Sequence, residues 1–230
     1  MSKFTVLALI LLISVFCVSG AEQQVVSSTF TPKASKKVQE KVDSIENTIG
    51  LIVLNKKNYS KGEFIHIYNE DGSLWHRFTY YYDDSDGKFE YAKDDFRPFA
   101  FHPDYFLLAL KCVRKERGRY EVIVNEGMRL KKYVKADDSV LRFETWKDHI
   151  LKAFAVKFLQ NENPLLNVPL GRVKKISLPN TSFHPFQVKG EWLKVRWNIT
   201  SRAKDKGKYD SGWIRWKKGE RLLVELFYFS

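Results

Sequence analysis

The stretch EWLKVRWNI, residues 191–199, carries the clearest strand pattern in the chain. Every second residue from Leu193 to Ile199 is apolar, and the residues between them are polar or amphipathic. Because successive side chains of a strand point to opposite faces, this alternation predicts a strand with one buried face. The stretch GWIRW, residues 212–216, alternates in the same way. After the turn Lys218–Gly219, residues 222–229 are apolar on both faces, which is typical of a well-covered strand.

The same alternation predicts a binding face. Leu193, Val195 and Trp197 belong to the buried set, so Trp192, Arg196, Trp213 and Arg215 must lie on the opposite side of their strands. Two indole rings beside two guanidinium groups would suit a peptide or a sugar ring. The alternative is that the first part of the chain or the proline-rich loops cover these tryptophans, since Trp is usually well buried.

Upstream, further strands alternate with turn sequences and predict an antiparallel β domain over residues 61–140. The predicted strands are residues 64–68, 74–82, 105–113, 120–124 and 128–134. A helical turn is expected at residues 145–149, followed by a strand over residues 153–159 and by long loops in the proline-rich residues 160–190. We therefore predict a mostly β (α+β) protein with an N-terminal helix.

Residues 150–230 resemble a bacterial Src-homology-3-like barrel. The resemblance lies in the motif WLKV at residues 192–195, the motif GWIRW at residues 212–216 and the hydrophobic closing strand. It implies a small β-barrel of the kind found in exported bacterial proteins. The preceding residues 21–145 resemble no family that we can name.

The first twenty residues have the layout of a secretory signal peptide. A short positive start that includes Lys3 precedes an uncharged apolar run over residues 4–18, and small residues follow from Ser19 to Ala21. The apolar run is short for a membrane anchor. We therefore expect cleavage after residue 20, an exported periplasmic or extracellular protein, and no membrane span after cleavage.

Residues 21–60 are expected to form a polar lead and an amphipathic helix. A set of apolar residues recurs at helical spacing, which predicts a helix from about residue 32 to residue 49 with Gly50 as its end. The set is Val38, Val42, Ile45, Ile49 and Ile52. The apolar stripe would pack on the protein itself or serve as the contact of a structural subunit.

No pattern in the sequence is typical of catalysis or metal binding. The chain has no Gly-x-Ser-x-Gly motif, and no two of its five histidines lie within five residues of one another. After signal cleavage Cys112 is the one remaining cysteine, and its apolar, strand-like surroundings predict an inert core thiol. The sequence thus predicts no enzyme, no cofactor and no metal site.

The charge balance indicates the class of partner. The chain has 39 Lys and Arg against 27 Asp and Glu, a formal net charge of +12. An export signal argues against nucleic acid, so the expected partner is a cell-wall peptide, a glycan, an anionic envelope polymer or an envelope protein. The alternative is that the basic residues form a solvated, mixed surface that aids solubility. We predict a non-enzymatic envelope binding protein. A hydrolase without a linear motif and a structural subunit are the alternatives; ionisable groups converging in a pocket would favour the hydrolase.

Overall fold

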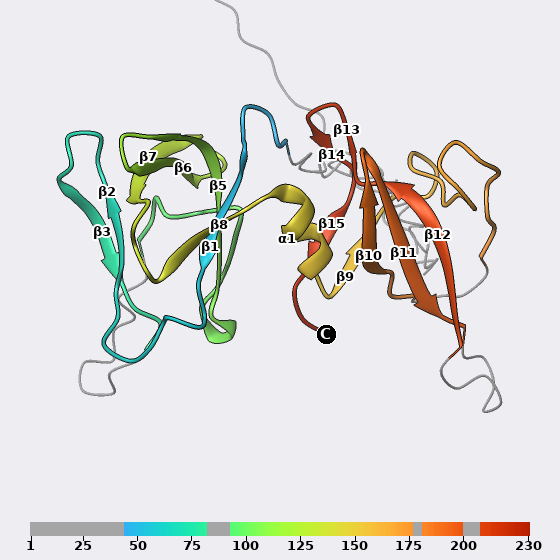
Figure 1. Ribbon diagram of the computed structural model, residues 1–230, viewed down its shortest axis with the longest axis horizontal. Coiled ribbons are helices and arrows are strands. Elements are labelled where there is room, and N and C mark those ends of the chain that lie inside the picture. The colour runs from blue at the N-terminus through green and yellow to red at the C-terminus, as the bar shows by residue number, and fades with distance from the viewer. Residues whose placement is uncertain (1–43, 82–92, 177–180, 200–207) are drawn as a thin grey trace, which may run out of the picture. The chain divides into compact units, whose positions relative to one another are not determined.

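The computed structural model describes residues 44–81, 93–176, 181–199 and 208–230 (Figure 1). These residues are mostly β and contain one α-helix. Every pairing between named strands is antiparallel. The predicted mostly-β class is therefore confirmed. The signal peptide and most of the expected N-terminal helix lie outside the described residues.

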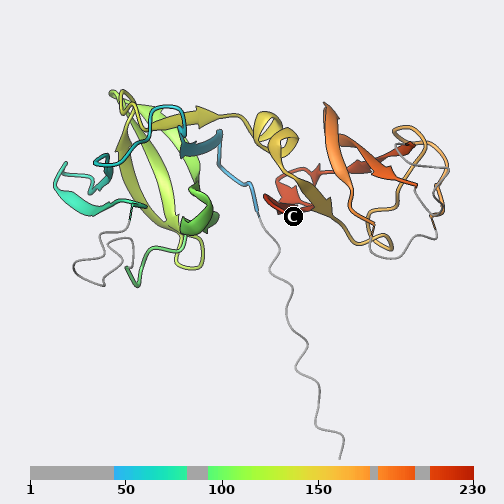
Figure 2. The same ribbon diagram turned by 90° about the horizontal axis from the view of Figure 1, so that it is seen from below.

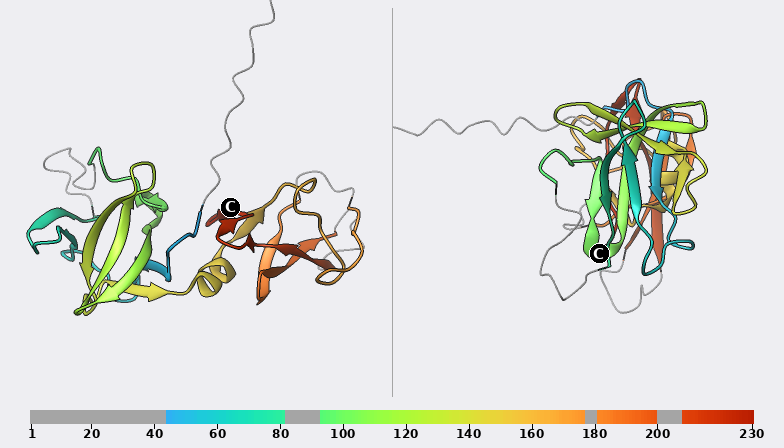
Figure 3. Two further views of the ribbon diagram at one scale, coloured as in Figure 1. Left: turned by 90° about the horizontal axis from the view of Figure 1, so that it is seen from above. Right: turned by 90° about the vertical axis from the view of Figure 1, so that its left-hand side faces the viewer.

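The first part of the described chain forms one curved eight-stranded sheet (Figure 2; Figure 3, left). Its order is β3-β2-β7-β6-β5-β1-β8, with β4 beside β5. The strands are β1 (Gly50–Leu54), β2 (Ile65–Tyr68), β3 (Leu74–Phe78), β4 (Ala100–His102), β5 (Leu107–Glu116), β6 (Arg119–Asn125), β7 (Leu130–Lys135) and β8 (Leu141–Glu144). A 3-10 turn (Pro103–Tyr105) precedes β5. The expected antiparallel pairing is found in the hairpins β2–β3, β5–β6 and β6–β7. The sheet also takes in β1 and β8, which lie outside residues 61–140.

Strand β1 corrects the end of the predicted helix. Residues 44–49 form a bridge and a turn rather than a helix, and Gly50 begins a strand instead of ending a helix. A Cβ atom at Gly50 would collide with the carbonyl oxygen of Glu144 and the ring of Phe143, so the close approach of β8 requires glycine there. All five residues of β1 are buried, which hides the period of two that would have identified the strand.

Helix α1 (Trp146–Lys152) follows β8 and confirms the predicted helical turn. The Oγ1 atom of Thr145 accepts a hydrogen bond from the backbone N–H of Asp148 at 3.1 Å, a typical N-terminal cap. The helix ends three residues later than predicted. It buries Trp146, His149 and Ile150, so His149 is brought into the interior from a helix whose other face is exposed.

The remaining strands form three small sheets. They are β9 (Ala155–Lys157), β10 (His184–Lys189), β11 (Trp192–Asn198), β12 (Tyr209–Arg215), β13 (Lys217–Lys218), β14 (Arg221–Leu222) and β15 (Glu225–Phe227). Strand β11 lies between β10 and β12, β13 pairs with β14, and β15 pairs with β9. The predicted closing strand over residues 222–229 is divided into β14, which pairs with β13, and β15, which pairs with β9.

Two apolar clusters form the core. One lies within the eight-stranded sheet and includes Ile52, Leu110 and Cys112. The other joins β1 and α1 to the C-terminal strands through Leu51 and Trp146. Its C-terminal members include the residues that the alternation places on the buried faces of their strands, Leu193, Val195, Trp197, Ile214 and Trp216. The buried position of Cys112 is confirmed, and burial raises the pKa of its thiol to about 12.

Candidate functional site

The outer face of β10, β11 and β12 carries the four residues that the sequence singled out. Trp192 lies opposite Arg215, and Lys194 lies opposite Trp213, so all of these side chains share one face with Arg196. The structure thus brings the four candidate residues onto one side of one sheet. Whether this face binds a partner stays a prediction.

Each cation in the middle of this face lies over an aromatic ring. The guanidinium of Arg215 is 4.6 Å from the centre of the Trp192 ring, and that of Arg196 is 5.5 Å from the ring of Tyr209. The ammonium of Lys194 lies 5.2 Å from the Phe186 ring and 5.7 Å from the Trp213 ring. We call the following set the aromatic–cationic face: Phe186, Lys189, Trp192, Lys194, Arg196, Tyr209, Trp213 and Arg215.

Sequence reasoning missed Phe186 and Tyr209. Tyr209 has the same parity as Trp213 but stands before the stretch taken as a strand, whereas β12 begins at Tyr209 itself. Phe186 lies at the irregularity between Pro185 and Gln187, where the register with β11 shifts by one residue. The two rings are 42% and 58% exposed, so they are the most accessible aromatic surface of the face.

The face is positively charged. Arg215 is paired with Glu191 at 2.9 Å. Among the described residues, no carboxylate lies within ion-pair distance of Lys189, Lys194 or Arg196. Three cations of the face therefore keep their charge available to a partner.

Trp213 supports the face rather than presenting its ring. It is only 8% exposed, and its backbone exchanges two hydrogen bonds of 2.8 Å with Leu166 from the proline-rich segment. Leu165 packs so closely on Gly212 that a Cβ atom there would collide with it. For Trp213 the predicted alternative, burial with help from the proline-rich loops, fits the structure better than an open ring. Trp192 remains partly exposed.

A second group of polar residues was not predicted from the sequence. Glu144 of β8 lies 3.2 Å from Nδ1 of His149, and Nε2 of His149 lies 3.0 Å from the hydroxyl of Tyr228. Lys152 donates to Glu144 at 2.7 Å, and Arg142 forms a further ion pair with it. These residues come from β8, α1 and the C-terminal end, so no linear motif could have revealed them.

Glu144 is ionised at neutral pH. Burial alone would raise its pKa, but the hydrogen bonds from His149 and Lys152 and the charge of Arg142 outweigh it and lower the pKa to about 2. A carboxylate can only accept, so Nδ1 of His149 donates to Glu144. In the neutral ring Nε2 is then an acceptor, and the hydroxyl of Tyr228 donates to it.

This group lies in the wall of a pocket of about 610 Å³. The pocket is lined by the end of β1 and the loop after it, the start of β5, and residues of β8, α1 and the C-terminal end. Its polar wall contains four cations against one carboxylate. The four cations are Lys56, Lys57, Arg142 and Lys152.

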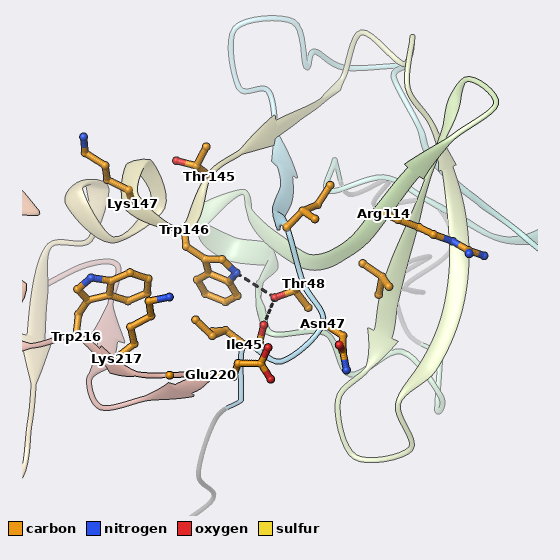
Figure 4. A pocket seen from close by; sticks show the side chains of 13 residues that line it. Ile45, Asn47, Thr48, Arg114, Thr145, Trp146, Lys147, Trp216, Lys217 and Glu220 are labelled. Carbon is orange, nitrogen blue, oxygen red and sulfur yellow. Dashed lines mark hydrogen bonds between the residues drawn. The ribbon is translucent and has the colours of Figure 1, made fainter. Parts of the chain in front are cut away.

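A further pocket, of about 620 Å³, lies where residues 45–49 meet α1 and the β13–β14 hairpin (Figure 4). The indole N–H of Trp146 donates to Thr48 Oγ1 at 3.1 Å, and that hydroxyl donates to the carbonyl of Ile45 at 2.5 Å. Arg114 points away from the pocket in this view. The polar groups of Trp146, Thr48 and Ile45 at the centre of this pocket thus hydrogen-bond to one another. This arrangement attaches residues 45–49 to the rest of the protein.

Within the described ranges, no group of three or more His, Cys, Asp or Glu residues could hold a metal ion. The described part of the chain also contains no helix of the length and apolarity that crossing a membrane requires. Comparisons of the chain with protein-family models, curated proteins and solved structures found no match.

Proposed function

We propose that this protein is an exported, non-enzymatic binding protein of the cell envelope. In this proposal residues 150–230 are a Src-homology-3-like module, and its aromatic–cationic face binds an acidic glycan. The observation that carries the proposal is the pairing of Lys194, Arg196 and Arg215 with aromatic rings on one open sheet face.

The pairing favours an anionic partner over a neutral one. A ring that already has a cation over it offers less surface for stacking by a neutral sugar. The ring also holds the cation in place, so less side-chain entropy is lost when the cation meets an anion. Lys189, Lys194 and Arg196 have no carboxylate partner among the described residues, which leaves their charges for the ligand. The expected export of the chain makes an envelope polymer the natural source of that charge.

The pocket beside Glu144 fulfils one condition for the hydrolase alternative, because ionisable groups converge there. A hydrolase that acts through a covalent intermediate also needs an activated nucleophile. Among the described residues that line the pocket there is no Ser, Thr or Cys. The one carboxylate of the wall, Glu144, has a side chain that is only 2% exposed and is paired with Arg142 and Lys152, so it is not presented as a nucleophile. We therefore favour binding over hydrolysis.

The test measures binding of the chain from Ala21 onward to polygalacturonate, an acidic glycan, and to dextran, a neutral one. We expect binding of polygalacturonate only, weakening as the salt concentration rises from about 0.1 M to 1 M. The double variant Lys194→Gln/Arg196→Gln should weaken binding by about tenfold or more, as for two lost charged hydrogen bonds.

The matched control is Lys61→Gln/Lys147→Gln, which removes the same charge from exposed positions outside the face. It should retain binding to within about twofold, because these two lysines lie outside the face and contribute only through the net charge of the protein. Equal losses in the two double variants would show that only net charge matters. That result, or equal binding of dextran, would overturn the proposal.

A further inference from the structure

We propose that the pocket beside β1 and α1 is a second binding site, for a small molecule that carries a carboxylate or phosphate group. Lys57, Arg142 and Lys152 would hold the anionic group. The proposal goes beyond the function proposed above, because it concerns another surface and a ligand small enough to enter a pocket.

The excess of positive charge is the first argument. Lys56, Lys57, Arg142 and Lys152 line one concavity with Glu144 as their single acidic neighbour in the wall. Like charges gathered in a concave site repel one another and also concentrate the field that attracts an anion. Lys56 donates to the carbonyl of Tyr105 at 2.9 Å, whereas Lys57 has no hydrogen bond or ion pair within the described residues. A bound anion would relieve this repulsion.

The remaining donors of the wall are the second argument. Glu144 engages Arg142 and Lys152, but an ammonium has three N–H donors and a guanidinium has five. The side chains of Arg142 and Lys152 are 40% and 54% exposed, so their other donors can be reached from solvent. Glu144 thus fixes two cations without using all their hydrogen-bonding capacity.

The buried histidine positions this arrangement. Both ring nitrogens of His149 are engaged, Nδ1 with Glu144 and Nε2 with Tyr228. The ring is 4% exposed, so it is not itself a ligand for the anion. It orients the carboxylate that orients Arg142 and Lys152, and it ties them to the C-terminal end of the chain.

The size and the apolar wall of the pocket define the class of ligand. A volume of about 610 Å³ lies in the range of roughly 300–1,000 Å³ that is usual for small-molecule sites. Val53, Leu54, Phe106 and Leu107 form the apolar part of the wall. An organic acid or an organic phosphate can use both parts, whereas an inorganic ion would leave the apolar wall unused.

The test uses isothermal calorimetry and thermal unfolding of the chain from Ala21 onward. The probes are glucuronate for the carboxylate, glucose 1-phosphate for the phosphate and glucose as the neutral control. We expect one or both anions to bind and to raise the Tm, and glucose to do neither. The anion with the larger effect identifies the headgroup.

Lys57→Gln is the decisive variant, because Lys57 has no described partner whose loss could disturb the fold. It should weaken anion binding by about tenfold, the effect of one charged hydrogen bond, and leave the Tm without ligand unchanged. Lys152→Gln should weaken it by a similar factor. Lys61→Gln removes the same charge elsewhere and should have no effect.

The two proposals fail separately. Lys194→Gln/Arg196→Gln should leave the binding of small anions intact, and Lys57→Gln should leave the binding of polygalacturonate intact. If neither anion binds at millimolar concentration, or if Lys57→Gln and Lys61→Gln weaken binding equally, the pocket is not an anion site. The proposal about the aromatic–cationic face would be untouched by that result.

Discussion

Strands β1 and β11 are both flanked by partners in their sheets, yet they differ in what they can offer to a ligand. All five residues of β1 are buried, whereas β11 alternates between buried and accessible side chains. Strand β1 has an apolar cluster on each face, with Leu51 in one and Ile52 in the other. Strand β11 has a cluster on one face only. The number of covered faces, not the position within the sheet, thus separates a strand that is wholly buried from one that keeps a face accessible.

The largest expected effects come from β1. Leu51→Ala and Ile52→Ala should each lower the free energy of unfolding by about 2–5 kcal/mol, because each leaves a cavity in a different apolar cluster. Urea unfolding of the chain from Ala21 onward, followed by circular dichroism, measures both values. If either substitution lowers the free energy of unfolding by less than about 1 kcal/mol, the corresponding face of β1 is not packed in an apolar core.

The next effect concerns Glu144, which lies opposite Leu51 in the β1–β8 pairing. Its pKa is about 2 in the folded protein against 4.5 for the unperturbed side chain. Since the folded-state pKa is the lower one, the contribution to stability is present above about pH 4.5 and is lost as the pH falls towards 2. A difference of this size corresponds to about 3 kcal/mol.

The measurement is urea unfolding of the wild-type protein and of Glu144→Gln between about pH 7 and pH 3. We expect the variant to be less stable at neutral pH and the difference to shrink as the pH falls. A difference that does not change with pH would mean that Arg142, Lys152 and His149 do not hold this carboxylate in its charged form.

A smaller effect is expected at Cys112, which lies opposite Gly50 on the other side of β1. Burial raises its pKa to about 12, so near pH 8 the thiol is protonated and unreactive. A thiol reagent should label the native chain from Ala21 onward far more slowly than the unfolded chain. Cys112→Ala should cost about 1 kcal/mol through a small cavity. Native labelling at the unfolded rate would show that this part of the sheet opens readily.

The same difference between the two strands explains what the sequence could predict. Strand β11 and its open face followed from alternation, because one accessible face leaves a period of two in the residues. Strand β1 was not predicted, because both of its faces are buried and its apolar residues show no period of two. Gly50 and Ile52 therefore also fitted the end of an apolar helical stripe.

The candidate pocket was beyond sequence reasoning for a different reason. His149 and Tyr228 are 79 residues apart, and their contact depends on how α1 and the C-terminal end pack. Neither residue has a neighbour in the sequence that signals a shared site. More of the aromatic–cationic face was predicted from the sequence. Two of its rings were missed, because Phe186 lies at a bulge and β12 begins earlier than predicted, at Tyr209.

The smallest effect on stability tests the open face directly. Lys194→Ala should change the free energy of unfolding by about 1 kcal/mol or less, since an exposed cation–π contact is worth roughly 0.5–1 kcal/mol. The adjacent Leu193→Ala, on the buried face of the same strand, should cost about 2–5 kcal/mol. Urea unfolding of the two variants compares neighbouring positions of one strand that point to opposite faces of its sheet. If Lys194→Ala cost as much as Leu193→Ala, both faces of β11 would support the fold as those of β1 do. The aromatic–cationic face would then be a structural surface, and its cations would be held for the sheet rather than for a ligand.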